Sequence, residues 1–538
     1  MDTANRFARY LRFRSVLDDP FVELDLSHSA LEESDVSALT PALTMALQAM
    51  QEVEAGSIAN ADEGRQVGHF WLRAPGLAPS EELEQAIRGS IDDLAAFVEA
   101  VHCGRIAPPE GGAFGKVVLC GIGGSALGPM LLNDIFGSPV AGDAAVGGSA
   151  VGNSGQPMQL FVLDNTDPEG IDRMLARVGS LQDALVIVIS KSGGTAETRN
   201  GMLEVRRAVE QQGLAFAARA IAVTMDGSKL HQLATGEEWL KTFPMWDWVG
   251  GRTSITSAVG LLPGALIGMD IRAFLAGAAA MDDATRNPDV WQNPAAMLAA
   301  FWHHEGQGKG ERAMVVLPYK DRMLLLSRYM QQLVMESLGK EHDRQGNVVN
   351  QGLAVYGNKG STDQHAYVQQ LRDGRHDFFA TFVRVLQDRD GDEYFEVADG
   401  VTAGDFLDGF WQGTRTALYE KGRRSATIAV DRVDERVLGA LVGLFERTVS
   451  IYAELIDTNA YNQPGVEAGK KAAGVVLDLQ GKLLAAITTD AQSVIALAAK
   501  VSADPADCWP ILQHLAANRS HVHVVRGHEP ADATFLRR

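Results

Sequence analysis

Short apolar runs alternate with longer amphipathic or alanine- and leucine-rich segments along most of the chain. A first series of apolar runs occupies residues 116–120, 160–163, 184–189 and 220–224, and a second series includes residues 313–317 and 382–386. Each run is short and mainly apolar, which is typical of parallel strands that are buried on both faces. Their alternation with helical patterns predicts an α/β fold with right-handed crossovers.

The two series of runs indicate two similar sheets, each mainly parallel and flanked by helices on both faces. We expect a helical N-terminal extension over residues 1–67, a first domain over 68–265, a second over 266–480, and a helical C-terminal extension over 481–538. The stretch 141–157, rich in glycine, alanine and serine, is expected to form a surface loop.

Composition narrows the class of protein. With 538 residues and 46% hydrophobic content, the chain is long enough for two or three domains. It has no apolar run near the ~18 residues needed to span a bilayer, and its first residues lack a secretory signal pattern. The cysteines Cys103, Cys120 and Cys508 show no paired or metal-ligand spacing, which favours a reduced, cytoplasmic compartment. The formal net charge of −20 disfavours a nucleic-acid or anionic-membrane partner.

One predicted strand-to-helix junction has the chemistry of a phosphate site. The run 184–189 leads directly into Ser190-Lys191-Ser192-Gly193-Gly194-Thr195. Hydroxyl donors, backbone amides next to glycines, one cation and the positive end of a helix suit a phosphate monoester. The pattern of a nucleoside-triphosphate loop is absent from this segment.

A second junction follows the run 116–120, where the chain continues as Gly-Ile-Gly-Gly-Ser-Ala from Gly121 to Ala126. Glycines between a strand and a helix let backbone amides approach an anion. The same residues fit the dinucleotide pattern G-x-G-x-x-A, but the candidate ribose ligand Asp164 follows about twice as late as that pattern requires. The two junctions predict one anion pocket at the carboxyl edge of the first sheet.

The peptide from Gln332 to Lys340 contains the best candidate for a base. It closes the segment 323–340, which we expect to be a single helix that stops at Gly339. The i,i+4 spacing places Gln332 and Glu336 on one helix face. In the last helical turn, the partial negative charge disfavours an ionised carboxylate, as suits a group that accepts a proton.

Three further candidates are cationic or titratable. Arg252 follows two glycines and is able to stabilise negative charge on an oxygen, with a glycine amide as second donor. His365 follows a hydroxyl-rich loop, where a lone histidine is more often structural, and Lys470 lies in an apolar segment containing glycine. The pairs His303-His304 and His521/His523 lack the spacing of a zinc site, so we expect no metal.

Taken together and in this order, these segments resemble the glucose-6-phosphate isomerase (phosphoglucose isomerase) family, in its bacterial or cyanobacterial-like branch. The resemblance runs from about Cys120 to Lys470. The motifs that carry it are Gly-Ile-Gly-Gly-Ser, Ser-Lys-Ser-Gly-Gly-Thr, Val-Gly-Gly-Arg, Gln-x-x-x-Met-Glu-Ser-x-Gly-Lys, Asp-Gln-His and Asn-Gln-x-Gly-Val-Glu-x-x-Lys.

The resemblance implies two sugar-isomerase (SIS) domains and a role for each candidate residue. It implies that the substrate contacts Gly124, Ser125 and Gln463, and that its 6-phosphate binds to Ser190, Lys191, Ser192 and Thr195. It also implies that Glu336 moves the proton between C1 and C2 with Gln332 alongside, and that Arg252 and the Gly251 amide stabilise a cis-enediolate. His365 and Lys470 are implied to assist opening of the sugar ring.

The family resemblance further implies a hexose 6-phosphate as substrate, no cofactor, and a homodimer in which His365 is shared across the interface. Two other functions stay open at this point. One is a non-catalytic sugar-phosphate sensor on the same domain type, which would not need Glu336, Arg252 and Lys470 together. The other is an NAD(P)-dependent dehydrogenase built on the glycine-rich segment Gly121–Ala126.

Overall fold

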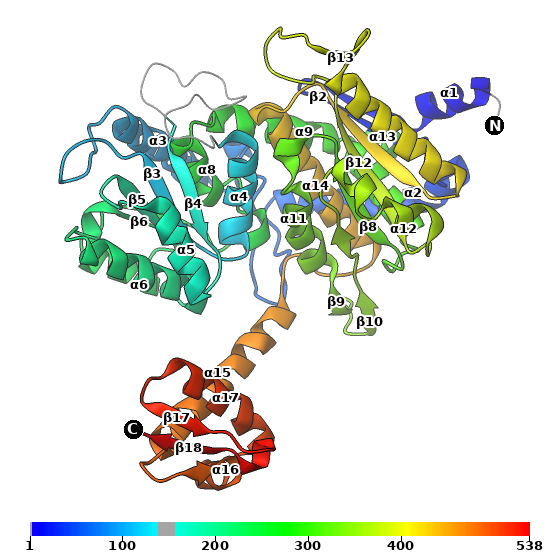
Figure 1. Cartoon of the computed structure of the whole chain (residues 1–538). Coiled ribbons are helices and arrows are strands. Elements are labelled where there is room, and N and C mark those ends of the chain that lie inside the picture. The colour runs from blue at the N-terminus through cyan, green and yellow to red at the C-terminus, as the bar shows by residue number, and fades with distance from the viewer. Residues whose placement is uncertain (1–2, 138–156) are drawn as a thin grey trace. The chain divides into compact units, whose positions relative to one another are not determined.

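The computed structural model describes residues 3–137 and 157–538, and the contacts within it divide the chain into two units, Met1–Asn462 and Gln463–Arg538. The first unit contains two large sheets, each covered by helices (Figure 1). The predicted α/β fold with two mainly parallel sheets is therefore confirmed. Most of the expected surface loop at 141–157 lies outside the described residues.

The first sheet is parallel throughout its described strands, in the order β4-β3-β5-β6-β7. Its strands are β3 (Lys116–Cys120), β4 (Gln159–Leu163), β5 (Ala184–Ile189), β6 (Ala220–Thr224) and β7 (Lys241–Pro244). Three predicted strands are confirmed residue for residue, and the run predicted at 160–163 forms a strand that begins at Gln159. Strand β7 was not predicted because only Phe243 in it is buried, so it lacks a continuous apolar run.

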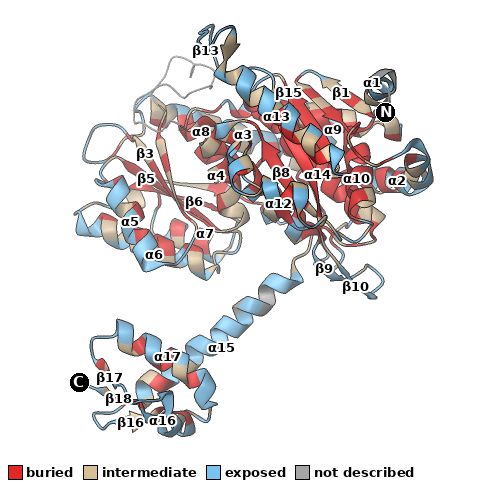
Figure 2. Ribbon diagram, turned by 45° about the vertical axis from the view of Figure 1, so that its right-hand side comes forward, coloured by how far each residue is buried: buried red, intermediate tan, exposed pale blue. Residues whose placement is uncertain are grey.

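Both faces of this sheet are covered, which explains the continuous apolar runs. Along β5, Leu185 and Ile187 belong to the large core of the unit, whereas Val186 and Val188 belong to a separate apolar cluster (Figure 2). The helices and 3-10 turns of this region are η1 (Pro75–Leu77), α3 (Glu81–His102), α4 (Gly124–Phe136), α5 (Pro168–Val178), α6 (Ala196–Gln211), η2 (Ala217–Arg219), α7 (Lys229–Gly236), η3 (Gly251–Thr253) and α8 (Ala258–Leu266).

The second sheet has the order β1-β2-β15-β12-β8-β11. Its strands are β1 (Arg14–Asp18), β2 (Phe21–Asp25), β8 (Ala313–Pro318), β11 (Val355–Tyr356), β12 (Phe378–Val385) and β15 (Ser425–Val430). From β15 to β11 the neighbours are parallel, whereas β1 and β2 are antiparallel to theirs. The prediction at 313–317 is confirmed. The strand predicted at 382–386 instead begins at Phe378, where it already pairs with Ala313 of β8.

The prediction of a purely helical extension over residues 1–67 is wrong. The segment contains α1 (Thr3–Arg12) and α2 (Glu33–Glu54), but β1 and β2 lie between them and join the second sheet. Val22 and Leu24 of β2 are buried and pair with Val430 and Ile428 of β15. The strands are only five residues long and their sheet partner lies far along the chain, so the local pattern did not reveal them.

The remaining elements of the first unit surround the second sheet. They are α9 (Ile271–Thr285), η4 (Val290–Gln292), α10 (Pro294–Glu305), η5 (Asp321–Met323), α11 (Leu326–Met330), η6 (Gln331–Glu336), η7 (Thr362–His365), α12 (Val368–Asp373), α13 (Ala403–Glu420) and α14 (Glu435–Leu455). Two small hairpins are formed by β9 (Lys340–His342) with β10 (Val348–Gln351) and by β13 (Glu396–Ala398) with β14 (Val401–Thr402).

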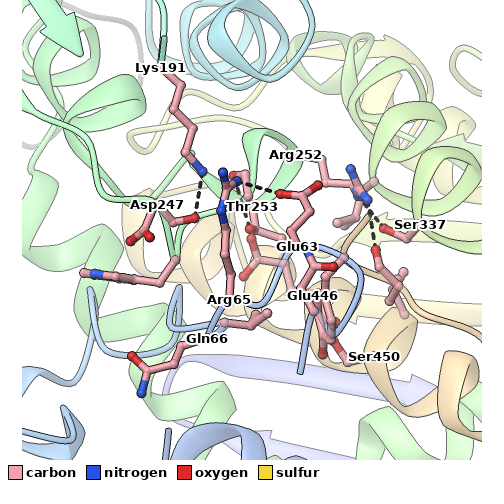
Figure 3. A pocket seen from close by; sticks show the side chains of 18 residues that line it. Glu63, Arg65, Gln66, Lys191, Asp247, Arg252, Thr253, Ser337, Glu446 and Ser450 are labelled. Carbon is pink, nitrogen blue, oxygen red and sulfur yellow. Dashed lines mark hydrogen bonds and ion pairs between the residues drawn. The ribbon is translucent and has the colours of Figure 1, made fainter. Parts of the chain in front are cut away.

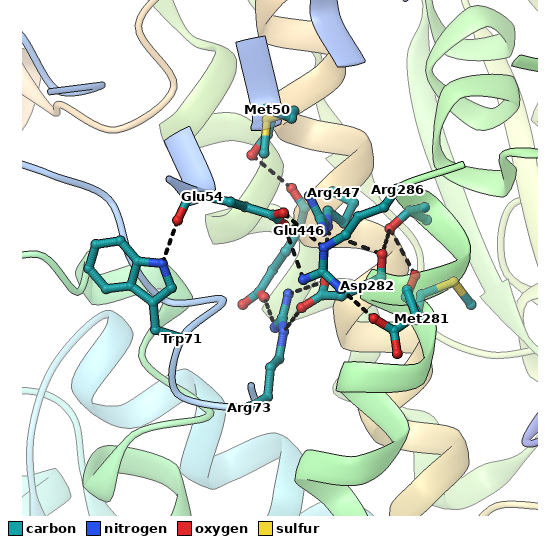
Figure 4. Close-up of polar contacts among 12 residues, drawn as sticks. Met50, Glu54, Trp71, Arg73, Met281, Asp282, Arg286, Glu446 and Arg447 are labelled. Atoms are coloured by element: carbon teal, nitrogen blue, oxygen red, sulfur yellow. Dashed lines mark hydrogen bonds and ion pairs between the residues drawn. The ribbon is translucent and has the colours of Figure 1, made fainter. Parts of the chain in front are cut away.

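A buried ionic network joins α2, α9 and α14 (Figure 4). Arg73 donates from Nε to Asp282 Oδ2 at 2.5 Å and also pairs with Glu446. Arg447 donates from Nε to Asp282 Oδ1 at 2.9 Å and pairs with Glu54. A buried ion without its partner would cost several kcal/mol, by the usual desolvation penalty, so these charges hold one another in place. The network thereby fixes α14, after which the chain continues to residues 460–462 at the candidate site.

The second unit contains α15 (Pro464–Ala486), β16 (Gln492–Ser493), α16 (Val494–Val501), α17 (Pro505–Asn518), β17 (Val522–Val525), η8 (Pro530–Asp532) and β18 (Thr534–Arg537). Its strands form an antiparallel sheet in the order β16-β18-β17, packed on a core that includes Leu497, Leu512 and Phe535. The expected helical C-terminal extension therefore also contains a sheet, and its expected start at residue 481 falls inside α15. Among the described helices, none has the length and apolar character needed to cross a membrane.

Candidate active site

Glu336 and Gln332 lie on η6, a turn of the π-helical type, and their side chains meet. Gln332 Nε2 donates a hydrogen bond to Glu336 Oε2 at 3.0 Å, which confirms the predicted shared face. The chain leaves the helical conformation at Gly339, as predicted. Single π-turns of this kind occur frequently at functional sites.

The single helix expected over residues 323–340 is wrong, because the segment is divided into η5, α11 and η6. Contacts with other elements compete with the regular helical bonds. The Leu325 amide donates to Asp134 Oδ2 of α4 at 2.8 Å, and Ser327 Oγ bonds to the Gly357 carbonyl. Helix propensity cannot anticipate such partners, which lie far away in the sequence.

Arg252 lies on η3 and its guanidinium is almost fully buried beside Glu336. Nε donates to Ser337 Oγ at 2.8 Å, and Nη1 lies 3.4 Å from Glu336 Oε2. Nη2 donates to the carbonyls of Ala460 at 2.9 Å and Asn462 at 2.8 Å. Burial lowers the pKa of Arg252, and the neighbouring Glu336 carboxylate opposes that shift. The guanidinium is therefore held in one place next to the candidate base.

The glycine loop after β3 touches both of these elements. A Cβ atom on Gly124 would lie 2.0 Å from the Gly251 carbonyl oxygen, so only glycine allows α4 to begin so close to η3. A Cβ atom on Gly123, whose φ is 57°, would lie 3.1 Å from Gln332 Nε2. Ser125 is half-buried in the first turn of α4, and no described side chain caps that helix. The glycine loop, the segment with Arg252 on η3 and the segment with Glu336 on η6 thus meet at one place.

The predicted phosphate loop joins β5 to α6, and its hydroxyls turn back onto its own backbone. Gly193 donates its amide to Ser190 Oγ at 3.1 Å, and Gly194 donates to Ser192 Oγ at 3.2 Å. Thr195 is the N-cap residue of α6, which no described side chain caps. Amides, hydroxyls and the positive helix end therefore converge as an anion-binding loop requires.

The Lys191 ammonium does not join that cluster of hydroxyls. Nζ donates to the carbonyls of Asp247 at 2.7 Å and Val249 at 3.0 Å, in the segment that leads to Arg252 (Figure 3). Burial, followed by the positive charge of Arg65, lowers the pKa of Lys191 to about 8. In this structure the lysine joins the phosphate loop to residues 247–252, the arginine loop, which the sequence did not suggest.

Lys340 and Ser337 were not predicted as site residues, although both lie in the motif that contains Glu336. Lys340 is buried, and Nζ donates to the carbonyls of Glu336 at 2.7 Å and Asn462 at 3.1 Å. The only signal in the sequence is the i,i+4 spacing of Lys340 from Glu336. The acceptors are backbone carbonyls, which every residue has, so the sequence does not indicate which of them accept these hydrogen bonds.

The remaining candidates stay predictions. His365 is exposed on η7, and in the described part of the chain it makes no hydrogen bond or ion pair with the other candidate residues. Gln463 is the first residue of the second unit. Lys470 falls on α15, but its side chain lies outside the described residues.

Arg252 and Lys191 also line a small cavity of about 50 Å³, together with Asp247, Ser337 and Glu446 (Figure 3). Within residues 3–137 and 157–538, no three His, Cys, Asp or Glu side chains are grouped so as to hold a metal ion. That the reaction needs neither a metal nor a cofactor stays a prediction.

Comparison with known proteins identifies relatives over nearly the whole chain. A family model described as phosphoglucose isomerase matches residues 25–403 and 413–493. A glucose-6-phosphate isomerase of Geobacter sp. (strain M21) is 52% identical over 521 residues, which are 95% of each chain. One of Rippkaea orientalis (strain PCC 8801 / RF-1) is 52% identical over 523 residues, 96% of each chain.

Solved structures share the fold. The crystal structure of a glucose-6-phosphate isomerase from Chlamydia trachomatis D/UW-3/Cx has a TM-score of 0.77 at 23% identity, covering 88% of this chain and 91% of that chain. The crystal structure of a protein from Thermus thermophilus, described as hypothetical, has a TM-score of 0.68 at 28% identity, covering 85% of this chain and 99% of that chain.

Proposed function

The chain belongs to the phosphoglucose isomerase family and interconverts glucose 6-phosphate and fructose 6-phosphate, and we propose that Glu336 is the base of this reaction. The observation that carries the proposal is the contact of one carboxylate with both the Gln332 amide and the Arg252 guanidinium. Family membership sets aside the sensor and the dehydrogenase as alternatives.

Substrate binding is proposed to begin at the phosphate loop. The Ser190, Ser192 and Thr195 hydroxyls exchange their internal hydrogen bonds for the oxygens of the 6-phosphate, and the first amides of α6 add their partial positive charge. Lys191 contributes its backbone to this loop, while its ammonium stays on the carbonyls of the arginine loop. Gly124 and Ser125 at the start of α4 contact the sugar.

In the open-chain aldose, Glu336 removes the proton from C2 and the negative charge moves onto the C1 oxygen. Among the described residues, the Gln332 amide and the Arg252 guanidinium both contact Oε2 of this carboxylate. Oε1 is therefore the oxygen proposed to take the proton. Return of that proton to C1, with transfer of the O2 proton to O1, gives the ketose.

Arg252 is proposed to stabilise the cis-enediolate, with the Gly251 amide as second donor. A buried, prearranged cation acts more strongly on developing charge than a solvated one. Ser337 and the carbonyls of Ala460 and Asn462 hold the guanidinium in advance, so little reorganisation is needed when the charge appears.

The exchange of Glu336 by glutamine tests the base directly. Glu336→Gln should lower kcat by at least ~10²–10⁴, the usual contribution of a general base, and abolish solvent-deuterium incorporation at C2. Inhibition by inorganic phosphate should stay unchanged, because the phosphate loop is intact. Glu341→Gln, at an exposed site nearby, is the matched control and should keep wild-type activity. More than about a tenth of wild-type kcat in Glu336→Gln would place the base elsewhere.

Ring opening is proposed to use His365 and Lys470, with Gln463 lining the pocket, in a homodimer where His365 serves the partner's site. The exposure of His365 and its lack of contact with the other candidates in the described residues support this arrangement. Glu336→Gln and His365→Ala chains, each nearly inactive, should complement when refolded together. About half of randomly formed dimers are mixed, so roughly a quarter of all sites should recover. Mixed dimers without recovered activity would place His365 in its own subunit's site.

The reaction is part of glycolysis and gluconeogenesis, and we propose that it takes place in the cytoplasm. Cys103, Cys120 and Cys508 are all unpaired, and Cys103 is exposed, which suits a reducing compartment.

A further inference from the structure

We propose that Lys340 is a positioning residue that holds the backbone of Glu336 in a fixed place relative to Arg252. The inference rests on the proposed roles of those two residues in the isomerisation. It assigns a function to a lysine that makes its contacts through backbone carbonyls.

The contacts of Lys340 connect the base with the arginine. Nζ donates to the carbonyl of Glu336 at 2.7 Å, at the end of η6, where the last carbonyls of a helix lack partners within the helix. It also donates to the carbonyl of Asn462 at 3.1 Å, which accepts a second hydrogen bond from Arg252 Nη2 at 2.8 Å. The Asn462 carbonyl therefore accepts hydrogen bonds from both Lys340 and Arg252. Lys340 connects this carbonyl to the backbone of Glu336.

Burial of the Lys340 ammonium costs folding free energy, which favours a functional role for its hydrogen bonds. Lys340 is only 6% exposed, and among the described residues no carboxylate lies within ion-pair distance of its ammonium. A buried ammonium whose hydrogen bonds go to carbonyl oxygens, without an ion-paired carboxylate, is less stable than one in water. A methionine of similar length would fill the same space without this cost, so the hydrogen bonds to the two carbonyls are what the lysine adds.

Among the described residues, the charged and titratable groups near Lys340 are Arg252 on η3, Glu336 on η6 and Asp62 in the N-terminal segment. Burial, followed by the charge of Arg252, lowers the pKa of Lys340 to about 7. Below pH 7 the ammonium is charged, so the exchange of Lys340 by methionine removes a positive charge from near the Glu336 carboxylate. Loss of this charge should therefore move the acid limb of the kcat/KM profile to higher pH, an effect that a merely structural residue would not have.

Steady-state kinetics of three variants test the proposal. Lys340→Met should lower kcat by at least about tenfold, as expected for a base misplaced by a fraction of an ångström, with inhibition by inorganic phosphate changed by less than about twofold. Lys340→Arg keeps the charge and the donors, and should recover part of kcat with an unshifted acid limb. Lys116→Met is the matched control, because Lys116 donates to the Ser180 carbonyl at 3.2 Å and to Asp183 at 3.0 Å at the opposite end of β3 from the glycine loop. That variant should change the melting temperature alone.

The outcomes separate this inference from the proposed function. A Lys340→Met enzyme with kcat within about twofold of wild type and an unmoved acid limb would overturn the inference, provided that Glu336→Gln is inactive. Activity in Glu336→Gln would instead overturn the proposed base. If Lys340→Met does not fold, Lys340→Gln, which keeps one neutral donor group, decides the question by the same two readouts.

Discussion

Replacing Gly124 by alanine should misplace the arginine loop without disturbing the phosphate loop. The added Cβ would lie 2.0 Å from the Gly251 carbonyl oxygen and 2.2 Å from its carbon, both backbone atoms that cannot rotate away. Ordinary contact begins at 3.4 Å, so the two segments would have to separate by about 1.4 Å. The residue after Gly251 is Arg252, and the displacement would therefore reach the guanidinium.

The magnitude follows from that displacement. Forcing one extra methyl group into a packed contact costs about 1–3 kcal/mol of folding free energy. A shift of about 1 Å in a catalytic group lowers the rate by roughly 10²-fold, equivalent to ~2.7 kcal/mol of transition-state stabilisation. Gly124→Ala should therefore remain folded at 25 °C with kcat reduced by about that factor.

Kinetics and urea denaturation of Gly124→Ala together distinguish the possible causes. A displaced Arg252 lowers kcat and leaves inhibition by inorganic phosphate unchanged, whereas a methyl group that blocks the sugar raises KM and leaves kcat intact. The matched control is Gly413→Ala in α13, where a Cβ would meet no atom within 4 Å. That exchange should be neutral or stabilise the protein by about 0.5–1 kcal/mol, since it lies in an exposed helix interior. A kcat of Gly124→Ala within twofold of this control would refute the reasoning.

Three other predictions concern charge. Arg447→Met should lower the free energy of unfolding by about 3–5 kcal/mol in urea denaturation, because the buried carboxylates of Asp282 and Glu54 each lose one of their cations. A loss under about 1 kcal/mol, as expected for an exposed pair such as that of Arg88, would show that the network is not essential. Lys191→Met should lower kcat with phosphate inhibition nearly kept, because the ammonium contacts the arginine loop, whereas Ser192→Ala should weaken phosphate inhibition with kcat nearly kept. Identical kinetic effects would contradict the contact of Lys191 with the arginine loop. Burial, followed by the charge of Arg415, lowers the pKa of His28 from 6.5 to about 4. As the pH falls from 6.5 to 4, the imidazole therefore binds a proton in the unfolded chain but not in the folded one. Stability is therefore lost on acidification across that window, and His28→Gln should make the fall shallower in denaturation curves measured at pH 6.5 and 4.5.

Much of the first sheet follows from the sequence alone. Strands β3, β5 and β6 begin and end where the apolar runs do, because a parallel strand covered on both faces needs apolar side chains at most positions. The glycine loop, the phosphate loop and the pair Gln332 and Glu336 were also identified locally, since each depends on residues that are close together in the chain. The same local patterns missed β1 and β7, whose residues are mostly only partly buried, and also β15, which is buried throughout.

Only the tertiary structure decided how the site is held together. Arg252 and Lys340 both donate to the Asn462 carbonyl, and Lys191 donates to the carbonyls of Asp247 and Val249. Every residue has such a carbonyl, so residue types give no sign of which ones serve as acceptors. The direction of Lys191 and the division of the expected helix at 323–340 depend on partners that folding brings near from distant parts of the chain. Residue types therefore determined which chemical groups are present, and packing determined which of them touch.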